Sequence, residues 1–388
     1  MTTDKQYYTP LLSPSKIGNM IVKNRLVAQA MEASDASENG GISDRALERY
    51  LRLAEGDWGI VFIEATSVTD ASLARIDGLI LNETTFPSFK NLVDRYKSIN
   101  PNSLILIQLT HSGCLSHPVT DRITPISQDK ALQSLTSKEI ESIRNQFIQA
   151  AKLSYLAGFD GIDFKLCHGY LGTELLRPSN NRVDQWGGTF ENRIRFWKLG
   201  IQDIRTALTS LGQRDFLLGS RISFHENILG GFGTGGPHTN EFDSAEPLSL
   251  IMQMQDLNLD YVNISGTEVN LSDYIINTPE EKLVNTLFYE RTVKEYLNTI
   301  CNKKRSEKKL LVIGTGYSQL GESSLQIAND RLNAGYTDFI GFGRQSFADP
   351  YMPQKLYHNE KINFCVGCNS CAKLMLNGHP SSCVVFDK

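Results

Sequence analysis

The 388-residue sequence contains no run of about 18 consecutive apolar residues, the length that a membrane-spanning helix needs. Its start, MTTDKQYYTP, has no apolar stretch like that of a secretory signal peptide. The formal net charge is only -4, which gives no electrostatic reason to expect a nucleic-acid partner. These absences predict a cytoplasmic protein without membrane or nucleic-acid partners, either a monomer or a homo-oligomer, that acts on a small molecule.

The chain has only seven cysteines, which is an odd number. A disulfide framework is therefore not expected in a long chain of this kind. Three cysteines are scattered and four gather near the end of the chain, at Cys365, Cys368, Cys371 and Cys383. Hydrophobic residues make up 40% and charged residues 21% of the chain, which is typical of a globular protein with a sizeable core.

Short apolar runs rich in β-formers recur along the chain, with helix-like segments between them. The eight runs cover residues 25–31, 60–65, 104–109, 161–165, 216–223, 260–265, 310–315 and 339–343. Eight alternating units predict an α/β fold, a single (β/α)8 TIM barrel. We assign the barrel to residues 1–360 and a cysteine-containing extension packed on it to residues 361–388.

Local turn and cap residues support this alternation. Thr136 and Glu139 have the spacing of a capping box at a helix start. Gly158 and Gly335 stand in similar short segments just before the fourth and eighth strands, where glycine accepts the left-handed conformation that closes a helix.

The fourth strand ends in a cluster of side chains that can bind a ligand or transfer a proton: Lys165, His168 and Tyr170. Because side chains alternate across a strand, Asp163 and Lys165 are expected on the face opposite to Ile162, and the polar groups gather at the carboxyl end of the strand. Ligands bind at that end in barrels of βα units. The plain alternative is a core histidine, a lysine that reaches solvent and a tyrosine that fills space.

Other strand ends add polar or small residues at the same rim. They are Ala30, Met31 and Glu32 after strand one, Ala65 after strand two, Gln108 on strand three and Arg221 on strand five. Strands seven and eight end in the glycine turns Gly314-Thr315-Gly316 and Gly341-Phe342-Gly343-Arg344. Glycine turns in these two places often hold a phosphate through backbone N–H groups, so the sequence predicts a phosphate-bearing ligand.

These residues resemble the old yellow enzyme family of FMN-dependent oxidoreductases. The matching motifs are Ile17-Gly18, Lys23-Asn24-Arg25, residues 108–113, residues 157–176, Asn181-Arg182, residues 186–188 and 191–193, Gly343-Arg344 and Ala348-Asp349-Pro350. They occur in the family's order over nearly the whole chain. The resemblance implies bound FMN and NAD(P)H as a co-substrate.

The resemblance also implies roles for single residues. Gln108 is expected to bind the pyrimidine edge of the flavin ring and Arg221 to lie near its N1 and O2 atoms. Gly316, Gly343 and Arg344 are expected to hold the phosphate. The remaining expected cofactor contacts are Ala30, Met31, Glu32, Ala65 and Gly314.

On the substrate side, the resemblance implies that Lys165 and His168 bind the substrate and that Tyr170 donates a proton as an activated C=C bond is reduced. One alternative is an FMN-dependent dehydrogenase or amine-oxidising enzyme. Another is a class I aldolase-like lyase that forms a Schiff base with Lys165. A third is a non-catalytic electron carrier.

Three residues depart from the family pattern: Lys165 replaces a histidine, Ala30 a proline, and Glu32 a threonine or cysteine. Each charge alone in a partly dry pocket is costly, so we expect Glu32 and Lys165 to interact and to favour a zwitterionic or strongly polar substrate. The alternative is that Glu32 faces solvent or pairs with Arg25 or another basic neighbour.

The terminal cysteines resemble the four-cysteine iron–sulfur site of the dienoyl-CoA reductase and trimethylamine dehydrogenase group, with two residues instead of three between Cys368 and Cys371. The resemblance implies a [4Fe-4S] cluster held by Cys365, Cys368, Cys371 and Cys383, and with it an electron-transfer partner. Zinc, or a remnant without metal, is the alternative.

Overall fold

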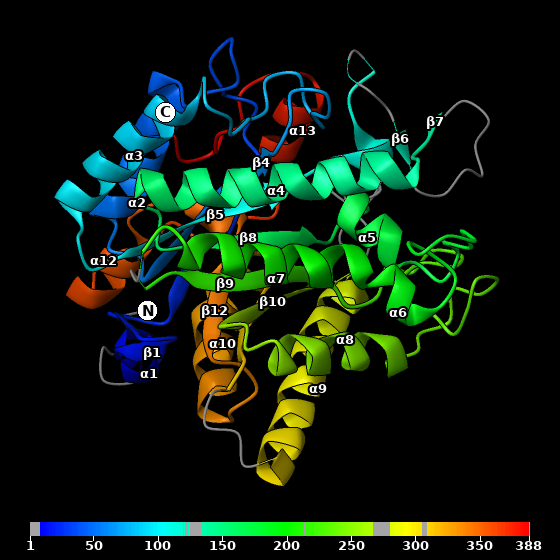
Figure 1. Cartoon of the computed structure of the whole chain (residues 1–388). Helices are drawn as coiled ribbons and strands as arrows, with labels where there is room; N and C mark the ends of the chain where they lie inside the picture. Colours follow the sequence, from blue (N-terminus) through cyan, green and yellow to red (C-terminus); the bar gives the residue numbers. More distant parts are fainter. Residues whose placement is uncertain are drawn as a thin grey trace.

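The computed structural model describes residues 8–118, 120, 123–124, 133–212, 215–266, 280–304 and 309–387. Eight parallel strands form a closed barrel in chain order, with β12 pairing back to β3 (Figure 1). The strands are β3 (Leu26–Ala28), β4 (Ile60–Ser67), β5 (Leu104–Thr110), β8 (Gly161–Leu166), β9 (Leu217–Ser223), β10 (Tyr261–Ser265), β11 (Leu311–Gly314) and β12 (Phe339–Phe342). The predicted (β/α)8 barrel is therefore confirmed, and each predicted strand overlaps an observed one.

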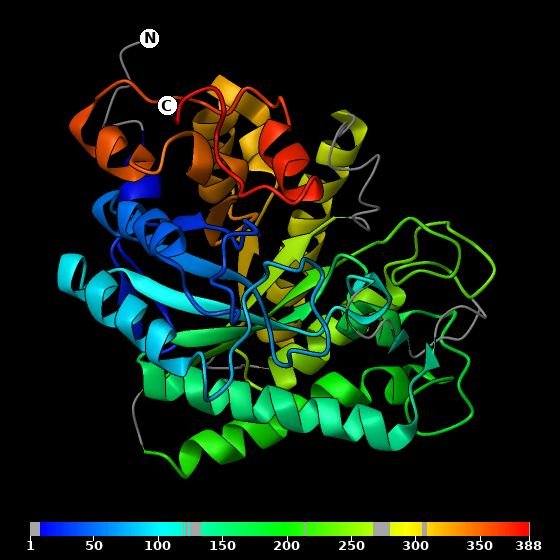
Figure 2. The ribbon, with the colours of Figure 1, turned by 90° about the horizontal axis from the view of Figure 1, so that it is seen from above.

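Helices surround the barrel on its outer side (Figures 1 and 2). The longer ones are α2 (Asp44–Glu55), α3 (Phe86–Ile99), α4 (Ser137–Ala157), α7 (Arg195–Thr209), α8 (Ala245–Asp256), α9 (Glu280–Lys304) and α10 (Ser324–Asn333). The shorter ones are α1 (Thr9–Leu12), α5 (Leu171–Leu176), α6 (Phe190–Arg193), α11 (Arg344–Ala348), α12 (Met352–His358) and α13 (Ser370–Leu376), with 3-10 turns at Gly113–Leu115 and Tyr317–Ser323. Among the described residues, no helix is long and apolar enough to cross a membrane.

The predicted helix ends are present. Thr136 caps α4, and the side chain of Glu139 returns the bond to the Thr136 backbone, which completes the capping box. Gly158 closes the same helix at φ 97°, and Gly335 follows α10 at φ 69°. Both glycines take the left-handed conformation that the sequence predicted.

The two faces of β8 divide as its alternation requires. Phe164 points outward and stacks on Phe147 of α4 at a ring-centroid distance of 4.3 Å, and Phe196 of α7 completes the cluster. Burying an aromatic side chain of this size contributes roughly 1.5–3 kcal/mol. Asp163 and Lys165 point the other way, into the barrel, where they meet polar partners.

The amino-terminal end of the barrel is closed by apolar side chains. A hairpin of β1 (Ser15–Ile17) and β2 (Met20–Val22), which the sequence analysis did not predict, turns at Gly18 with φ 55°. Ile17 and Val22 are fully buried in one cluster with residues from the strand starts, such as Leu217 and Tyr261. A ligand is thus left with the carboxyl end of the barrel.

The segment after α12 packs on that carboxyl end (Figure 2). The backbone N–H of Ser381 donates to the carbonyl of Ala33 at 2.7 Å, and the N–H of Cys365 donates to Gln345 Oε1 at 2.8 Å. Two small strands, β6 (Ile123–Thr124) and β7 (Gln133–Ser134), lie outside the barrel. The division at residue 360 stays a prediction, although these contacts agree with an extension packed on the barrel.

Candidate active site

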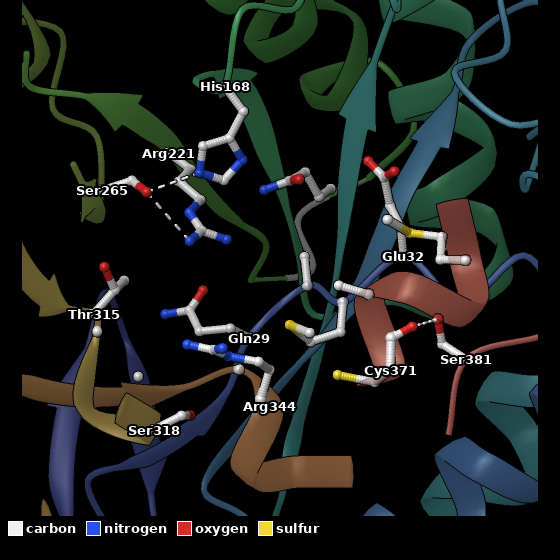
Figure 3. Close-up of a pocket in the computed structure, with 18 of the residues that line it drawn as sticks. Gln29, Glu32, His168, Arg221, Ser265, Thr315, Ser318, Arg344, Cys371 and Ser381 are labelled. Carbon is white, nitrogen blue, oxygen red and sulfur yellow. Dashed lines mark hydrogen bonds between the residues drawn. The ribbon is translucent and has the colours of Figure 1, made fainter. Parts of the chain in front are cut away.

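A cavity of about 270 Å³ opens at the carboxyl ends of the strands (Figure 3). Most of the predicted site residues lie on its wall. They are Ala30, Met31, Glu32, Gln108, Lys165, His168, Tyr170, Arg221, Gly316, Gly343 and Arg344. We call it the main cavity. The structure thus brings together residues that are up to about three hundred positions apart in the chain, at the end of the barrel where ligands bind.

Two predicted residues lie elsewhere. Ala65 lines a separate small cavity that adjoins the main one. Gly314 ends β11 beside a buried carboxylate, and a Cβ atom there would collide with Glu290. The contact with Glu290 is enough to require glycine at position 314, whether or not a ligand binds beside it. Both cofactor contacts stay predictions.

Glu32, Lys165 and Tyr170 form one network across the cavity. Lys165 Nζ donates to Glu32 Oε1 at 3.2 Å, and the Tyr170 hydroxyl donates to the same oxygen at 2.5 Å. The ammonium also lies 3.3 Å from the centroid of the Tyr170 ring, a close cation–π contact. The predicted interaction between Glu32 and Lys165 is confirmed.

This network sets the protonation states of its members. Burial alone would raise the pKa of Glu32, but Lys165, Arg75 and the bond from Tyr170 together hold that pKa below its ordinary value. Burial and the Glu32 carboxylate raise the pKa of Tyr170 well above its ordinary value. At neutral pH, Glu32 is therefore an anion and Tyr170 keeps its proton.

His168 and Arg221 meet at the hydroxyl of Ser265 (Figure 3). His168 has a left-handed backbone with φ 64°, and its Nε2 lies 2.8 Å from the Ser265 hydroxyl. Arg221 Nη2 donates to the same hydroxyl at 3.4 Å. Burial, then Arg221 and Lys165, lower the pKa of His168 well below its ordinary value, so the imidazole is neutral.

Gln108 is held from inside the barrel. Its Nε2 donates to Asp163 Oδ2 at 2.5 Å, which leaves the amide oxygen to face the cavity. Burial raises the pKa of Asp163 to about 6, although Gln108, Arg221 and Lys165 oppose this shift. Within the described part of the chain, the buried Nε of Arg221 has no hydrogen-bond partner.

The opposite end of the cavity is built from main chain. Gly316 takes a left-handed conformation at φ 93°, and a Cβ on Gly343 would lie 2.8 Å from Met31 Sδ. Arg344 begins α11 and donates to the side chain of Asn369 in the terminal extension. Small residues here let a ligand approach backbone N–H groups closely.

The four terminal cysteines are brought together around one small cavity. All four line one small cavity of about 20 Å³ beside Arg344. Four thiols are the right donor set for a [4Fe-4S] cluster. However, the part of the chain that the structure describes has no group of three or more His, Cys, Asp or Glu side chains placed to hold a metal ion. The cluster stays a prediction.

Several residues of the main cavity were not predicted from the sequence, among them Gln29, Arg75 and Ser265. Gln29 exchanges two hydrogen bonds with the side chain of Asn263 at 3.2 and 2.7 Å. Ser265 ends β10, so the rule that strand ends carry the site could have found it. Arg75 lies in the loop after β4, where no periodic pattern marks it, and its Nη2 is 3.9 Å from Glu32 Oε2.

Comparison with known proteins agrees with this geometry. Residues 10–363 match the NADH:flavin oxidoreductase / NADH oxidase family, and the chain belongs to this family. The resemblance to FMN-dependent oxidoreductases of the old yellow enzyme type is thus confirmed at the level of the family.

Relatives and solved structures add detail. The chain is 26% identical over 381 residues to an NADH oxidase of Thermoanaerobacter brockii, covering 94% of this chain and 53% of that protein. It is 25% identical over 395 residues to the N,N-dimethylglycine/sarcosine dehydrogenase of Chromohalobacter salexigens, covering 97% and 53%. It thus spans about half the length of these relatives. The old yellow enzyme homologue from Zymomonas mobilis has the same fold, with a TM-score of 0.72 at 18% identity over 97% of this chain and 98% of that chain.

The polar groups that line the main cavity suit the ring and the phosphate of FMN. The unpartnered Nε of Arg221 would donate to a carbonyl or ring-nitrogen acceptor of such a ligand, and the amide oxygen of Gln108 would accept from a ring N–H. Gly316 and Gly343 leave backbone accessible beside Arg344, as a phosphate requires. These residues would hold the ring and the phosphate of FMN.

Proposed function

We propose that the chain is an FMN-dependent oxidoreductase that takes hydride from NAD(P)H and reduces an activated C=C bond in a polar substrate. The observation that carries this proposal is the buried Tyr170 hydroxyl, which keeps its proton and lies in one cavity with Lys165 and His168. A proton donor beside two substrate-binding groups is what addition of hydride and proton across a double bond needs.

FMN, when bound, would supply the hydride. The chain supplies the remaining steps. Lys165 and His168 bind the electron-withdrawing group of the substrate and thereby polarise its double bond. Tyr170 then gives the hydroxyl proton to the substrate carbon opposite the one that receives hydride. Arg221 supplies a fixed positive charge that would compensate negative charge on a reduced flavin bound beside it.

Lys165 in place of a histidine bears on the substrate. Its ammonium is held by Glu32, with a second cation, Arg75, nearby. An ammonium suits an anionic or strongly polar group better than a neutral ketone. We therefore propose that the substrate carries such a group.

Dehydrogenation of an amine is the second candidate. The carboxylate of Glu32 and the ammonium of Lys165 present both signs of charge to the main cavity. A zwitterionic substrate matches such a pair, and a related protein is named for oxidation of dimethylglycine and sarcosine. The lyase alternative loses support, because the chain belongs to a family of flavin oxidoreductases.

An anaerobic stopped-flow experiment tests the proposal. The purified protein is expected to show a flavin spectrum, to bleach with NADH or NADPH, and to recover its colour with ketoisophorone, an activated enedione. Bleaching by sarcosine-type amines as the reductant, in place of NAD(P)H, would favour the second candidate. A colourless protein that does not take up added FMN would contradict both.

A further inference from the structure

A second cavity of about 20 Å³ adjoins the main cavity and shares Glu32, Arg75 and Tyr170 with it. Ser34 and Thr110 form other parts of its wall. A polar cavity needs roughly 10–15 Å³ of such volume to hold one water molecule. The space therefore suits one water and is too small for an organic ligand.

Three buried polar atoms on this wall have no hydrogen-bond partner among the described residues: Ser34 Oγ, Thr110 Oγ1 and Arg75 Nε. Ser34 is only 4% exposed and Thr110 only 3%. An unsatisfied buried polar group costs about 1–3 kcal/mol, so three of them around one space are a strong sign of a bound polar molecule. Ser34 is also held at φ 51°, an uncommon conformation for serine.

The two cavities meet at the Glu32 carboxylate. Its Oε1 accepts from Tyr170 at 2.5 Å and from Lys165 at 3.2 Å. Its Oε2 is 3.9 Å from Arg75 Nη2, which is too far for a direct hydrogen bond and leaves both groups able to contact a water in the second cavity. One oxygen thus serves the reacting side, and the other lies toward Arg75.

We propose that this second cavity binds an ordered water through Ser34, Thr110 and Arg75, and that Glu32 relays protons from this water to Tyr170. The relay rests on the proposed function, whereas the water site does not. It gives the unusual Glu32 a task beyond balancing the charge of Lys165.

Each proton that leaves Tyr170 is replaced through Glu32 and the bound water. The Tyr170 O–H bond breaks when its proton goes to the substrate carbon, which leaves a tyrosinate. The water gives a proton to Glu32, the Glu32 carboxyl gives one to the tyrosinate, and solvent returns one proton to the water. Tyr170 is only 6% exposed, so its hydroxyl has little direct access to bulk water with a substrate bound.

The charged groups around Glu32 suit this task. Lys165 from β8 and Arg75 from the loop after β4 keep Glu32 ionised between turnovers, ready to accept a proton. The other carboxyl on the cavity wall, Glu64, is held by Arg49 at 2.5 Å and by the N–H of Ala33 at 2.8 Å. Glu64 therefore fixes the backbone beside Glu32.

A crystal structure of the holoenzyme at a resolution that shows ordered water tests the site itself. We expect a peak within hydrogen-bonding distance of Ser34, Thr110 and Arg75 in the wild type. We expect its loss in the double variant Ser34→Ala, Thr110→Val. Thr206→Val on the exposed face of α7 is the matched control and should keep the peak. A wild-type cavity without density would overturn the proposal, whatever the enzyme's activity.

Rates then test the relay. With ketoisophorone as acceptor, we expect the double variant to be reoxidised about tenfold more slowly, a smaller loss than the ~10²–10⁴-fold effect of a direct general acid. Reduction by NAD(P)H should be unchanged.

In mixtures of H₂O and D₂O, the wild-type rate should depend on deuterium content along a curve, because several protons move, and the double variant should approach a straight line. Water density together with wild-type rates and curvature in the double variant would overturn the relay. An enzyme that reduces no double bond would refute the proposed function and leave the water site standing.

Discussion

The two ends of the main cavity are built on different principles. At the end that we call the β8 wall, Lys165, His168 and Tyr170 present side chains that are already paired with Glu32 and Ser265. The other end, which we call the glycine wall, comprises Gly316, Gly343 and Arg344.

The glycine wall presents backbone atoms and the guanidinium of Arg344 to the cavity. It can bind the same group in many relatives, because backbone N–H groups do not change with sequence. The β8 wall can change its substrate with one substitution. This difference agrees with the expectation from the sequence that the departures from the family pattern include Lys165 and Glu32, whereas none was expected at the glycine wall.

The largest effect is expected on the β8 wall. Tyr170→Phe should slow reoxidation by ketoisophorone by about 10²–10⁴-fold, because the proton donor is lost while the ring is kept. Reduction by NAD(P)H should stay within about twofold of wild type, which stopped-flow absorbance can show. Equal slowing of both half-reactions would mean that Tyr170 only shapes the cavity.

The next effect belongs to the glycine wall. Arg344→Gln should weaken FMN binding by about 10- to 100-fold, because a hydrogen bond to a charged group contributes roughly 1.5–3 kcal/mol. Fluorescence titration of the apoprotein with FMN measures this loss. Arg45→Gln on the exposed side of α2 is the control and should bind FMN normally. Unchanged affinity in Arg344→Gln would remove Arg344 from the predicted phosphate site.

A smaller effect tests whether the β8 wall acts as a unit. A double-mutant cycle with Glu32→Gln and Lys165→Met, scored by the free energy of unfolding, should give a coupling of about 0.5–3 kcal/mol, as for contacting residues. The exposed pair Arg291 and Glu295, also in contact at 2.8 Å, should give only about 0.3–0.5 kcal/mol. Additive effects in the buried pair would show two independent charges.

The smallest expected effect lies beneath the two walls, inside the barrel. The pKa of Asp163 is raised to about 6 in the folded state, against roughly 3.9 in an unfolded chain. The folded state therefore binds more protons between these values, and this group lowers stability as the pH rises through that window. Asp163→Asn should remove that fall in a series of thermal unfolding curves.

Asp184 provides an internal contrast to this pH dependence. Arg182 lowers the pKa of Asp184 to about 2, so its contribution is lost as the pH falls toward that value. Asp184→Asn should therefore lower stability near neutral pH and have little effect in acid, where the wild type has already lost this contribution. A stability profile of Asp163→Asn that runs parallel to that of the wild type would contradict the raised pKa.

Much of the fold could be predicted from the sequence because its signals are local. Apolar runs mark the eight strands, Thr136 and Glu139 mark a helix start, and Gly158 marks a helix end. The β1–β2 hairpin was missed, since strands as short as Met20–Val22 carry almost no periodic pattern. Its role as a plug is set by long-range packing on Leu217.

The site was predictable where a residue follows a strand end and unpredictable where a loop folds back. Gln108, Lys165 and Arg221 lie where their strands place them. Arg75 reaches Glu32 from a loop, and this contact depends on the path of the chain and not on spacing. The thiols of the extension share one cavity, as their clustering suggested, while their use as ligands stays a prediction.

The extension that crosses the glycine wall has a kinetic consequence. Asn369 holds Arg344, Ser381 is tied to Ala33, and Cys371 and Met375 contribute to the wall of the main cavity. We expect a phosphate-bearing ligand seated there to be released faster when these contacts open. Its residence time would then depend on how often the terminal extension separates from the barrel, and two proteins with identical glycine walls would differ in how long they retain the same cofactor.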